Sequence, residues 1–486
     1  MATIKLNFHS NGNTHHLHNQ TFTKISTPFY FSLRYQKMFR AFRVKCGVSA
    51  TFKSIEKTSC VHEQWRDIHG QDNWSKMLNP MDPLLRCELI RYGEMAQACY
   101  DAFDNNPYSK YCGSCKVPPK TFFQDLGIDN VGYDITSYIY SSNTSNLIPK
   151  FFTKSIHSDG PWNPVVNWMG YVAVSNDETT ARLGRRDITI SWRGTVTKLE
   201  WMEDLVNFLK PVSTQKLASQ DPGIKVMAGF LHIYTDKHQK CLYSMFSARE
   251  QLLAEIRRLT KIYGQKGEEM SITITGHSLG SALAILSAYD IAESDLHRID
   301  KQKTPISVIS FSGPRVGNTR FKKRVEELGI KVLRVFNVHD KVPNVPGVLL
   351  NEFTSSLAQS IADWTTIFYS HIGEEIALNH MKSFYVKEKL DLASMHNLEL
   401  LLHLLDGYHG KDAKFSPATG MDKALVNRNG DILKHEYLIP PNWSQVENKG
   451  LRKNANGIWE LPKQNGIEDH LRLDEVELHL RNLGLI

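Results

Sequence analysis

Residues 271–288 read SITITGHSLGSALAILSA, and they give the strongest indication of the fold of the chain. Its first five residues are mostly β-branched and favour a strand, whereas the Ala- and Leu-rich run after Gly280 favours a helix. The five residues between them, GHSLG at 276–280, match the pattern G-x-S-x-G of a sharp strand-to-helix turn. The pattern predicts that Ser278 projects from the top of a sheet, where helix amides and the helix dipole favour a developing negative charge.

A five-residue pattern also occurs by chance, as an ordinary Gly/Ser turn between a strand and a helix. The surrounding sequence therefore has to support the fold. Helical spacing of apolar residues predicts a helix over 82–106, and a short helix is expected over 321–328. The β-branched and aromatic content predicts further strands at 168–175, 187–192, 306–311 and 331–338. Alternating strands and helices predict an α/β fold with a mostly parallel central sheet and helices on both faces.

The charge of the chain is concentrated at its amino end. Residues 1–55 contain no Asp or Glu but carry eight of the 58 Lys and Arg residues, together with many Ser and Thr. This composition predicts an organelle transit peptide, for a chloroplast or alternatively a mitochondrion. A disordered basic tail is the other interpretation. The remaining residues are nearly neutral, with 50 basic and 51 acidic side chains, which argues against a nucleic-acid partner.

Membrane spans and metal centres are not indicated. No run of about 18 apolar residues occurs, so any membrane contact is expected to be peripheral. The seven cysteines form no regular framework, and Cys112 and Cys115 make a single CxxC. That pair lacks the second pair that a structural zinc site needs. A redox-active disulfide, a static bridge and two ordinary thiols all remain open for Cys112 and Cys115.

A serine hydroxyl becomes a good nucleophile only when an imidazole takes its proton and a carboxylate orients that imidazole. Behind a G-x-S-x-G turn, the expected order is Ser, then Asp or Glu, then His. Asp340 follows the strand expected at 331–338, although an Asp there could also simply cap a turn. Downstream of it lie five candidate histidines: His371, His380, His396, His403 and His409. We favour His396, at an expected loop-to-helix junction, with His403 as the alternative.

Several separate motifs, taken together and in this order, resemble a known family. They are Arg193-Gly194-Thr195, 276–280, 312–318, 337–343, 369–374 and 436–443. The set resembles the class 3 (fungal-type) triacylglycerol lipases, and more closely the plant class I phospholipases A1, which are plastid-targeted acylhydrolases related to the anther-dehiscence lipase. The resemblance implies an α/β-hydrolase fold. The resemblance covers roughly Asp82 to the C-terminus. With the composition of the amino end, three parts are expected: a transit peptide at 1–55, a helical extension at 56–120, and a lipase-type domain with a C-terminal extension at 121–486.

The resemblance assigns roles to individual residues. It implies Ser278 as the acyl-ester nucleophile, Asp340 as the acid and His396 as the base. Thr195 and the backbone amide of Leu279 would hold the oxyanion, although a bare Arg-Gly-Thr is more often an ordinary turn. Hydrolysis through an acyl-enzyme with these groups needs no metal or organic cofactor.

The expected substrates also come from the resemblance. Family members release the sn-1 acyl chain of phosphatidylcholine and often of plastid galactolipids, so membrane glycerolipids are the expected partners. A lid helix is expected over Thr197–Leu209, although an ordinary surface helix is the alternative. Leu349–Tyr369 could line an acyl groove, touch a membrane, or form core. The competing functions are a triacylglycerol lipase and a catalytically inactive lipid-binding protein that keeps the fold.

Overall fold

A computed structural model describes residues 61–142, 166–196, 209–211, 216–219, 221–238, 241–299, 302–346, 369–444, 452–453, 459–460 and 473–486. The predicted transit peptide lies outside the described residues. So do nearly all of the predicted lid helix and of the apolar segment at 349–369.

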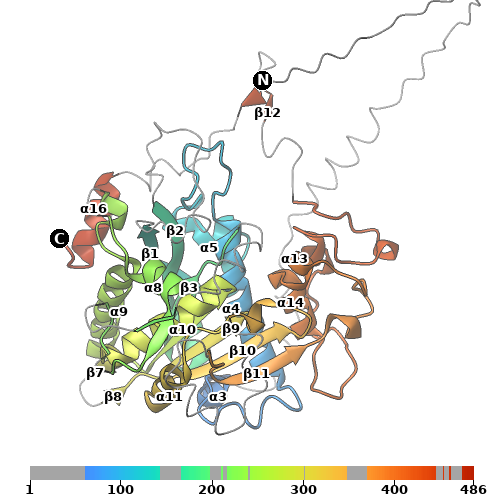
Figure 1. The fold of residues 1–486 in the computed structure, drawn as a ribbon, viewed down its shortest axis with the longest axis horizontal. Coiled ribbons are helices and arrows are strands. Elements are labelled where there is room, and N and C mark those ends of the chain that lie inside the picture. The colour runs from blue at the N-terminus through green and yellow to red at the C-terminus, as the bar shows by residue number, and fades with distance from the viewer. Residues whose placement is uncertain are drawn as a thin grey trace, which may run out of the picture. The chain divides into compact units, whose positions relative to one another are not determined.

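A seven-stranded sheet forms the centre of the molecule, with the order β1-β2-β3-β6-β9-β10-β11 (Figure 1). Its strands are β1 Tyr133–Ser142, β2 Val166–Ser175, β3 Arg186–Trp192, β6 Met270–His277, β9 Ile306–Phe311, β10 Lys331–Asn337 and β11 Glu374–Leu378. The five strands from β3 to β11 are parallel, whereas β1 and β2 pair antiparallel at one edge. The predicted mostly parallel sheet is therefore confirmed. The short strands form separate two-stranded pairs: β4 Leu209–Pro211 with β5 Lys225–Met227, β7 Arg298–Ile299 with β8 Gln302–Lys303, and β12 Arg452–Lys453 with β13 Trp459–Glu460.

Register brings the carboxyl ends of the parallel strands to one edge of the sheet. Trp192 of β3 pairs with Gly276 of β6, and His277 at the end of β6 pairs with Phe311 of β9. The residues that follow these strands, and those that follow β10, therefore emerge side by side. In open α/β sheets this edge is where binding and catalytic groups gather.

Helices cover both faces of the sheet. They are α3 Val61–Ile68, α4 Pro83–Asp101, α5 Phe122–Asp125, α6 Asp177–Leu183, α8 Ala228–Thr235, α9 Ala248–Gln265, α10 Leu279–Glu293, α11 Thr319–Glu327, α13 Leu392–Met395, α14 Leu398–Asp406 and α16 Leu473–Asn482. Side chains of β9 alternate between two cores: Ile309 and Phe311 pack in the core that contains α4, and Val308 packs in the core that contains α10. Because successive side chains of a strand point to opposite faces, α4 and α10 lie on opposite sides of the sheet.

The predicted helix at 82–106 is α4. Asp82 caps it, accepting hydrogen bonds from the amides of Leu84 and Leu85, and Pro83 occupies its first turn. The helix shares one hydrophobic core with strands of the sheet. The division of the chain at residue 120 stays a prediction. None of the helices in the described ranges is both long and apolar enough to cross a membrane.

Three local features of the fold were not predicted. Strand β1 was missed, because its mixed Tyr, Ile and Ser content masks its alternation. The polar link after Ser175 is not a plain turn, because Asn176 caps helix α6 by accepting from the Thr179 amide at 2.9 Å. His371 lies just before β11 and not within it.

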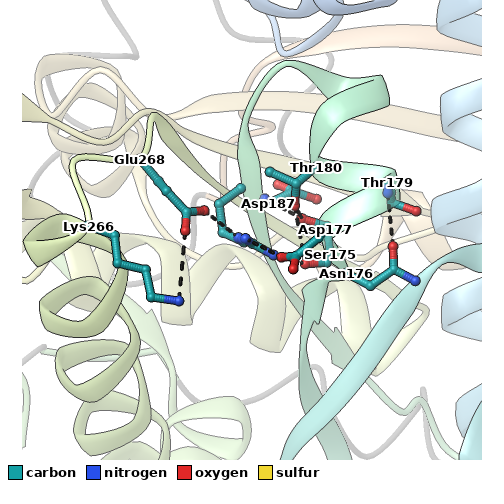
Figure 2. Close-up of polar contacts among 9 residues, drawn as sticks. Ser175, Asn176, Asp177, Thr179, Thr180, Asp187, Lys266 and Glu268 are labelled. Atoms are coloured by element: carbon teal, nitrogen blue, oxygen red, sulfur yellow. Dashed lines mark hydrogen bonds and ion pairs between the residues drawn. The ribbon is translucent and has the colours of Figure 1, made fainter.

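An ion-pair cluster joins the start of β3 to the segment that leads into β6. Arg186 binds Asp177 of α6 at 2.7 Å and Glu268 at 2.6 Å, and Lys266 lies 4.0 Å from the same glutamate. Figure 2 shows Asp177, from α6, and Glu268, from the segment before β6, on either side of this cluster. Glu268 lies two residues before β6, the strand that Ser278 directly follows, so the cluster helps to fix β6 against its neighbour.

Candidate active site

Ser278 occupies a strained turn between β6 and α10. Its backbone has φ 58° and ψ −125°, a region that costs a non-glycine residue free energy and is found at functional sites. The flanking glycines explain why the turn can close. A Cβ on Gly276 would lie 2.4 Å from the carbonyl carbon of Gly280, and a Cβ on Gly280 would lie 2.3 Å from the Trp192 oxygen. Ser278 is held in this position by its amide, which donates to the Phe311 carbonyl at 2.9 Å.

Asp340 and His396 meet although 56 residues separate them in sequence. His396 Nδ1 donates to Asp340 Oδ2 at 2.7 Å, and both side chains are buried. The other carboxylate oxygen accepts from the Val342 amide at 2.9 Å. Asp340 stands in the turn that follows β10, and His396 is the single residue between α13 and the Asn397 cap of α14. Because a carboxylate only accepts, Nδ1 carries the hydrogen, and in neutral His396 the Nε2 atom is the one left to accept a proton.

The other downstream histidines have different partners. His371 bonds Arg334, His380 lies against Asn337 and the Glu388 carbonyl, His403 bonds Ser383, and His409 bonds Arg86 and the Ser416 carbonyl. Burial, followed by the charge of Lys423, lowers the pKa of His403 to about 4. The geometry therefore favours His396 over His403 as the partner of Asp340.

Two polar atoms of this cluster lack hydrogen bonds to any described residue. They are Ser278 Oγ and His396 Nε2, and both are buried. No hydrogen bond joins the two atoms to each other. Buried polar atoms are rarely left unpaired, and catalytic hydrogen bonds often tighten only when substrate binds. A hydroxyl and an imidazole nitrogen left free in this way are available to react with a substrate.

The turn after β3 lies directly against the nucleophile elbow, the strand-to-helix turn formed by residues 276–280. A Cβ on Gly194 would come within 2.6 Å of the His277 oxygen. Arg193, which is buried, donates from Nη1 to the Gly194 carbonyl at 2.7 Å and stacks over the Phe103 ring at 3.7 Å. In a trans peptide the carbonyl and the following N–H point in opposite directions. Arg193 therefore aims the Thr195 N–H away from its own guanidinium.

Leu279 is the first residue of α10, where backbone amides have no acceptor within the helix. Gly280, the next residue, packs against Trp192 and Arg193. The amides of Leu279 and Thr195 thus come from two segments in direct contact, as an oxyanion hole requires. Both assignments remain predictions.

Three side chains around this cluster were not predicted from the sequence to take part in it. They are Arg193, which holds the Gly194 carbonyl, His277 within the elbow, and Tyr100 of α4. Tyr100 is bonded to His277 at 2.8 Å, yet nothing in its helical run sets it apart from an ordinary core tyrosine. His277 could have been singled out, because it is a titratable residue next to the nucleophile.

Other predicted groups lie elsewhere. Cys112 and Cys115 are both fully buried thiols, and burial raises the pKa of each to about 12. A raised pKa disfavours the thiolate that redox exchange requires. Within the described ranges, no group of three or more His, Cys, Asp and Glu side chains is arranged to hold a metal ion.

The chain is similar in sequence to a known family and to several named proteins. Residues 189–350 match the family model described as Lipase (class 3). The chain is 52% identical over 436 residues to Phospholipase A1-Igamma2, chloroplastic, of Arabidopsis thaliana, spanning 89% of this chain and 82% of that relative. It is likewise 52% identical over 419 residues to Phospholipase A1-Igamma1, chloroplastic, of the same plant, spanning 85% and 80%. Identity to Galactolipase DONGLE, chloroplastic, also of Arabidopsis thaliana, is 42% over 351 residues, spanning 70% and 69%.

Proposed function

Because the chain belongs to the class 3 lipase family, in the branch of the plant chloroplastic phospholipases A1, we propose that it is a serine acylhydrolase of glycerolipids. It removes the sn-1 acyl chain from phosphatidylcholine and from plastid galactolipids and releases a free fatty acid. Membership of the family makes the chain a carboxylic ester hydrolase, and its chloroplastic relatives confirm the predicted chloroplast localisation.

The observation that carries this proposal is the hydrogen bond between Asp340 and His396 beside a strained elbow serine. Asp340 orients the imidazole and stabilises its cation. His396 Nε2 accepts the proton of Ser278 as the hydroxyl oxygen attacks the acyl carbonyl carbon. The negative charge on the former carbonyl oxygen is stabilised by the amides of Thr195 and Leu279.

Collapse of this intermediate breaks the bond to the glycerol oxygen. His396 gives its proton to that oxygen, so the lysolipid leaves and the acyl group stays on Ser278. His396 then accepts a proton from water as the water oxygen attacks the acyl carbonyl carbon. It passes this proton to Ser278 Oγ as the acyl–oxygen bond breaks and the fatty acid leaves. Each residue returns to its starting protonation state, so the cycle balances without a cofactor.

The lipid preference is supported by the relatives, two of which are named phospholipases and one a galactolipase. Glycerolipids lie in membranes, so the enzyme must meet its substrate at a bilayer surface. Peripheral contact is consistent with this requirement.

The test is hydrolysis of positionally labelled lipids by the full chain. Monogalactosyldiacylglycerol, phosphatidylcholine and triolein are supplied separately, the first two with different acyl chains at sn-1 and sn-2. We expect the wild-type chain to release the sn-1 acid from one or both polar lipids. The Ser278→Ala variant should release none.

Three results would contradict this proposal. Preferential hydrolysis of triolein would indicate a triacylglycerol lipase. Release of the sn-2 acid would contradict the positional assignment. No hydrolysis of any lipid, with no covalent labelling of Ser278 by a fluorophosphonate, would favour an inactive lipid-binding protein.

A further inference from the structure

A buried chain of hydrogen bonds runs behind the elbow from Tyr100 to His396. The Tyr100 hydroxyl lies 2.8 Å from His277 Nδ1, and His277 Nε2 lies 2.9 Å from the backbone oxygen of His396. A carbonyl oxygen can only accept, so Nε2 carries the hydrogen. In a neutral His277 the Nδ1 atom is then an acceptor, and the Tyr100 hydroxyl donates to it.

His277 is not a second base. Both of its ring nitrogens are engaged, and its side chain is buried. Burial first, and then the neighbouring His396, lower the pKa of His277 well below its usual value. The ring therefore stays neutral while His396 becomes charged. This matters because the two ring centroids are only 4.5 Å apart, and a second cation there would oppose the imidazolium of His396.

His396 is consequently held at two points. Asp340 fixes its ring through Nδ1, and His277 fixes its backbone through the carbonyl. These two contacts act on a residue that forms the whole link between α13 and the cap of α14. Since His277 directly precedes Ser278, the carbonyl contact ties the base to the nucleophile's own turn.

The other end of the chain reaches the turn that carries Thr195. A Cβ on Gly194 would lie 2.0 Å from the Tyr100 hydroxyl oxygen, so the two groups are in close contact. Burial raises the pKa of Tyr100, so its hydroxyl keeps its proton and can donate it to His277. The hydroxyl thus lies between the Gly194 backbone and His277.

We propose that Tyr100 and His277 are positioning residues that set His396 relative to the elbow and to the Thr195 turn. This inference rests on the proposed function, in which His396 is the base. Neither residue makes a hydrogen bond to Ser278 Oγ or to His396 Nε2. They act by holding the His396 backbone, so their loss misplaces Nε2, and a displacement of about 1 Å is sufficient for a hundredfold loss of rate.

The experiment compares Tyr100→Phe, His277→Phe and His277→Gln with the wild-type full chain. The first variant removes only a hydroxyl, the second keeps a ring but removes both hydrogen bonds, and the third keeps an amide that can donate to the His396 carbonyl. Fluorophosphonate titration counts reactive sites, and kcat, KM and the pH profile are then measured per site with p-nitrophenyl butyrate.

We expect kcat per titrated site to fall about tenfold in Tyr100→Phe and about a hundredfold in His277→Phe. KM and the acid midpoint of the kcat profile should change little, and His277→Gln should recover part of the loss. Because both residues act through one chain, Tyr100→Phe/His277→Phe should be about as slow as His277→Phe alone.

Tyr92→Phe is the matched control. Tyr92 is the other tyrosine of α4, it is buried, and its hydroxyl donates to Asp187 at 2.9 Å, near the amino-terminal ends of β3 and β6. We expect it to lower the melting temperature without changing kcat per site.

Per-site kcat within twofold of wild type in both Tyr100→Phe and His277→Phe would overturn the inference. So would a loss in Tyr100→Phe that Tyr92→Phe reproduces. A wild-type protein that neither hydrolyses the ester nor reacts with the fluorophosphonate would instead contradict the proposed function, which separates the two failures.

Discussion

Two serines at opposite ends of β6 are buried alike but bonded differently. Ser271, near the start of the strand, donates to Asp187 Oδ1 at 2.6 Å and accepts from Arg185 Nε at 2.7 Å. Ser278, directly after the strand, has a hydroxyl with no partner among the described residues. A buried hydroxyl costs free energy unless it is hydrogen-bonded. Hydrogen bonds to Ser271 therefore stabilise one end of the strand. At the other end, the hydroxyl of Ser278, the proposed nucleophile, has no partner among the described residues.

The surroundings of each serine show the same contrast. Asp187 accepts from five hydroxyls, those of Tyr92, Tyr133, Thr189, Ser271 and Thr273. Burial alone would raise its pKa, but the Arg185 guanidinium and these donors hold the pKa below its usual value. Asp340 has one amide and one imidazole as partners. The many hydrogen bonds to Asp187 hold its carboxylate firmly in place. Asp340 has only two partners, and one of them, His396, keeps a nitrogen that can accept a proton.

The sharpest test of this contrast is Ser278→Ala, with the largest expected effect. Turnover should fall on the order of 10⁵-fold or more, because the nucleophile is removed. The free energy of unfolding should stay the same or rise slightly, since an unpaired buried hydroxyl is lost. Ester hydrolysis and urea unfolding measure the two quantities. A clear loss of stability would mean that the Ser278 hydroxyl is bonded after all.

Asp187→Asn tests the opposite end. It removes the negative charge that compensates the buried Arg185 guanidinium, so we expect a loss of about 3–5 kcal/mol in the free energy of unfolding. Activity per fluorophosphonate-titrated site should remain near wild type. Urea unfolding followed by tryptophan fluorescence gives the first value. If per-site activity fell a hundredfold with stability intact, the division between the two ends would be wrong.

Ser271→Ala is the counterpart of Ser278→Ala on the same strand. We expect a loss of about 1–3 kcal/mol in unfolding free energy, because Asp187 and Arg185 each lose one hydrogen bond. Catalysis should be unaffected. The pair of alanine variants, measured side by side, should therefore show opposite outcomes: one stable and inactive, the other active and less stable. Equal unfolding free energies in the two variants would contradict the proposed difference between the two ends of β6.

The sequence revealed more about the catalytic end than about the structural one. The G-x-S-x-G turn, the strand-end Asp340 and a histidine at a helix junction all follow from local chemistry and chain order. The Asp187 network could not be foreseen, because Asp187, Ser271 and Thr273 read as ordinary polar positions of two strands. They become a cluster only when β3 and β6 pair in register, which sets Asp187 beside Ser271 and Thr189 beside Thr273.

The fold followed from the same signals. Strong β-branched runs predicted β2, β3, β6, β9 and β10 to within one or two residues. The weaker patterns of β1 and α6 were missed because tertiary pairing and a capping asparagine, and not local propensity, decide them. Among the five candidate histidines, the expected helix-junction position favoured His396 but did not exclude His403. The selection of His396 depends on the packing that brings α13 to the turn after β10.

The smallest expected effect concerns His69, a buried neutral histidine at the structural end of the sheet. Its Nε2 lies 3.2 Å from the Thr273 hydroxyl, and burial, followed by the charge of Arg185, lowers its pKa to about 3. The unfolded chain, with an ordinary pKa near 6.5, therefore binds a proton between pH 6.5 and 3 that the folded chain does not. Stability is full above pH 6.5 and falls with acidification through that window.

In His69→Asn, which keeps a donor for Thr273, this source of acid sensitivity is gone. Between pH 7 and pH 5.5, we expect the wild type to lose about 1 kcal/mol more unfolding free energy than the variant does, by proton linkage. Urea unfolding at the two pH values gives the difference, whatever the variant's absolute stability. Equal losses in both proteins would mean that His69 already takes up its proton in the folded state. The structural end of β6 would then tolerate a buried charge, and the contrast with the catalytic end would be weaker than the hydrogen bonds imply.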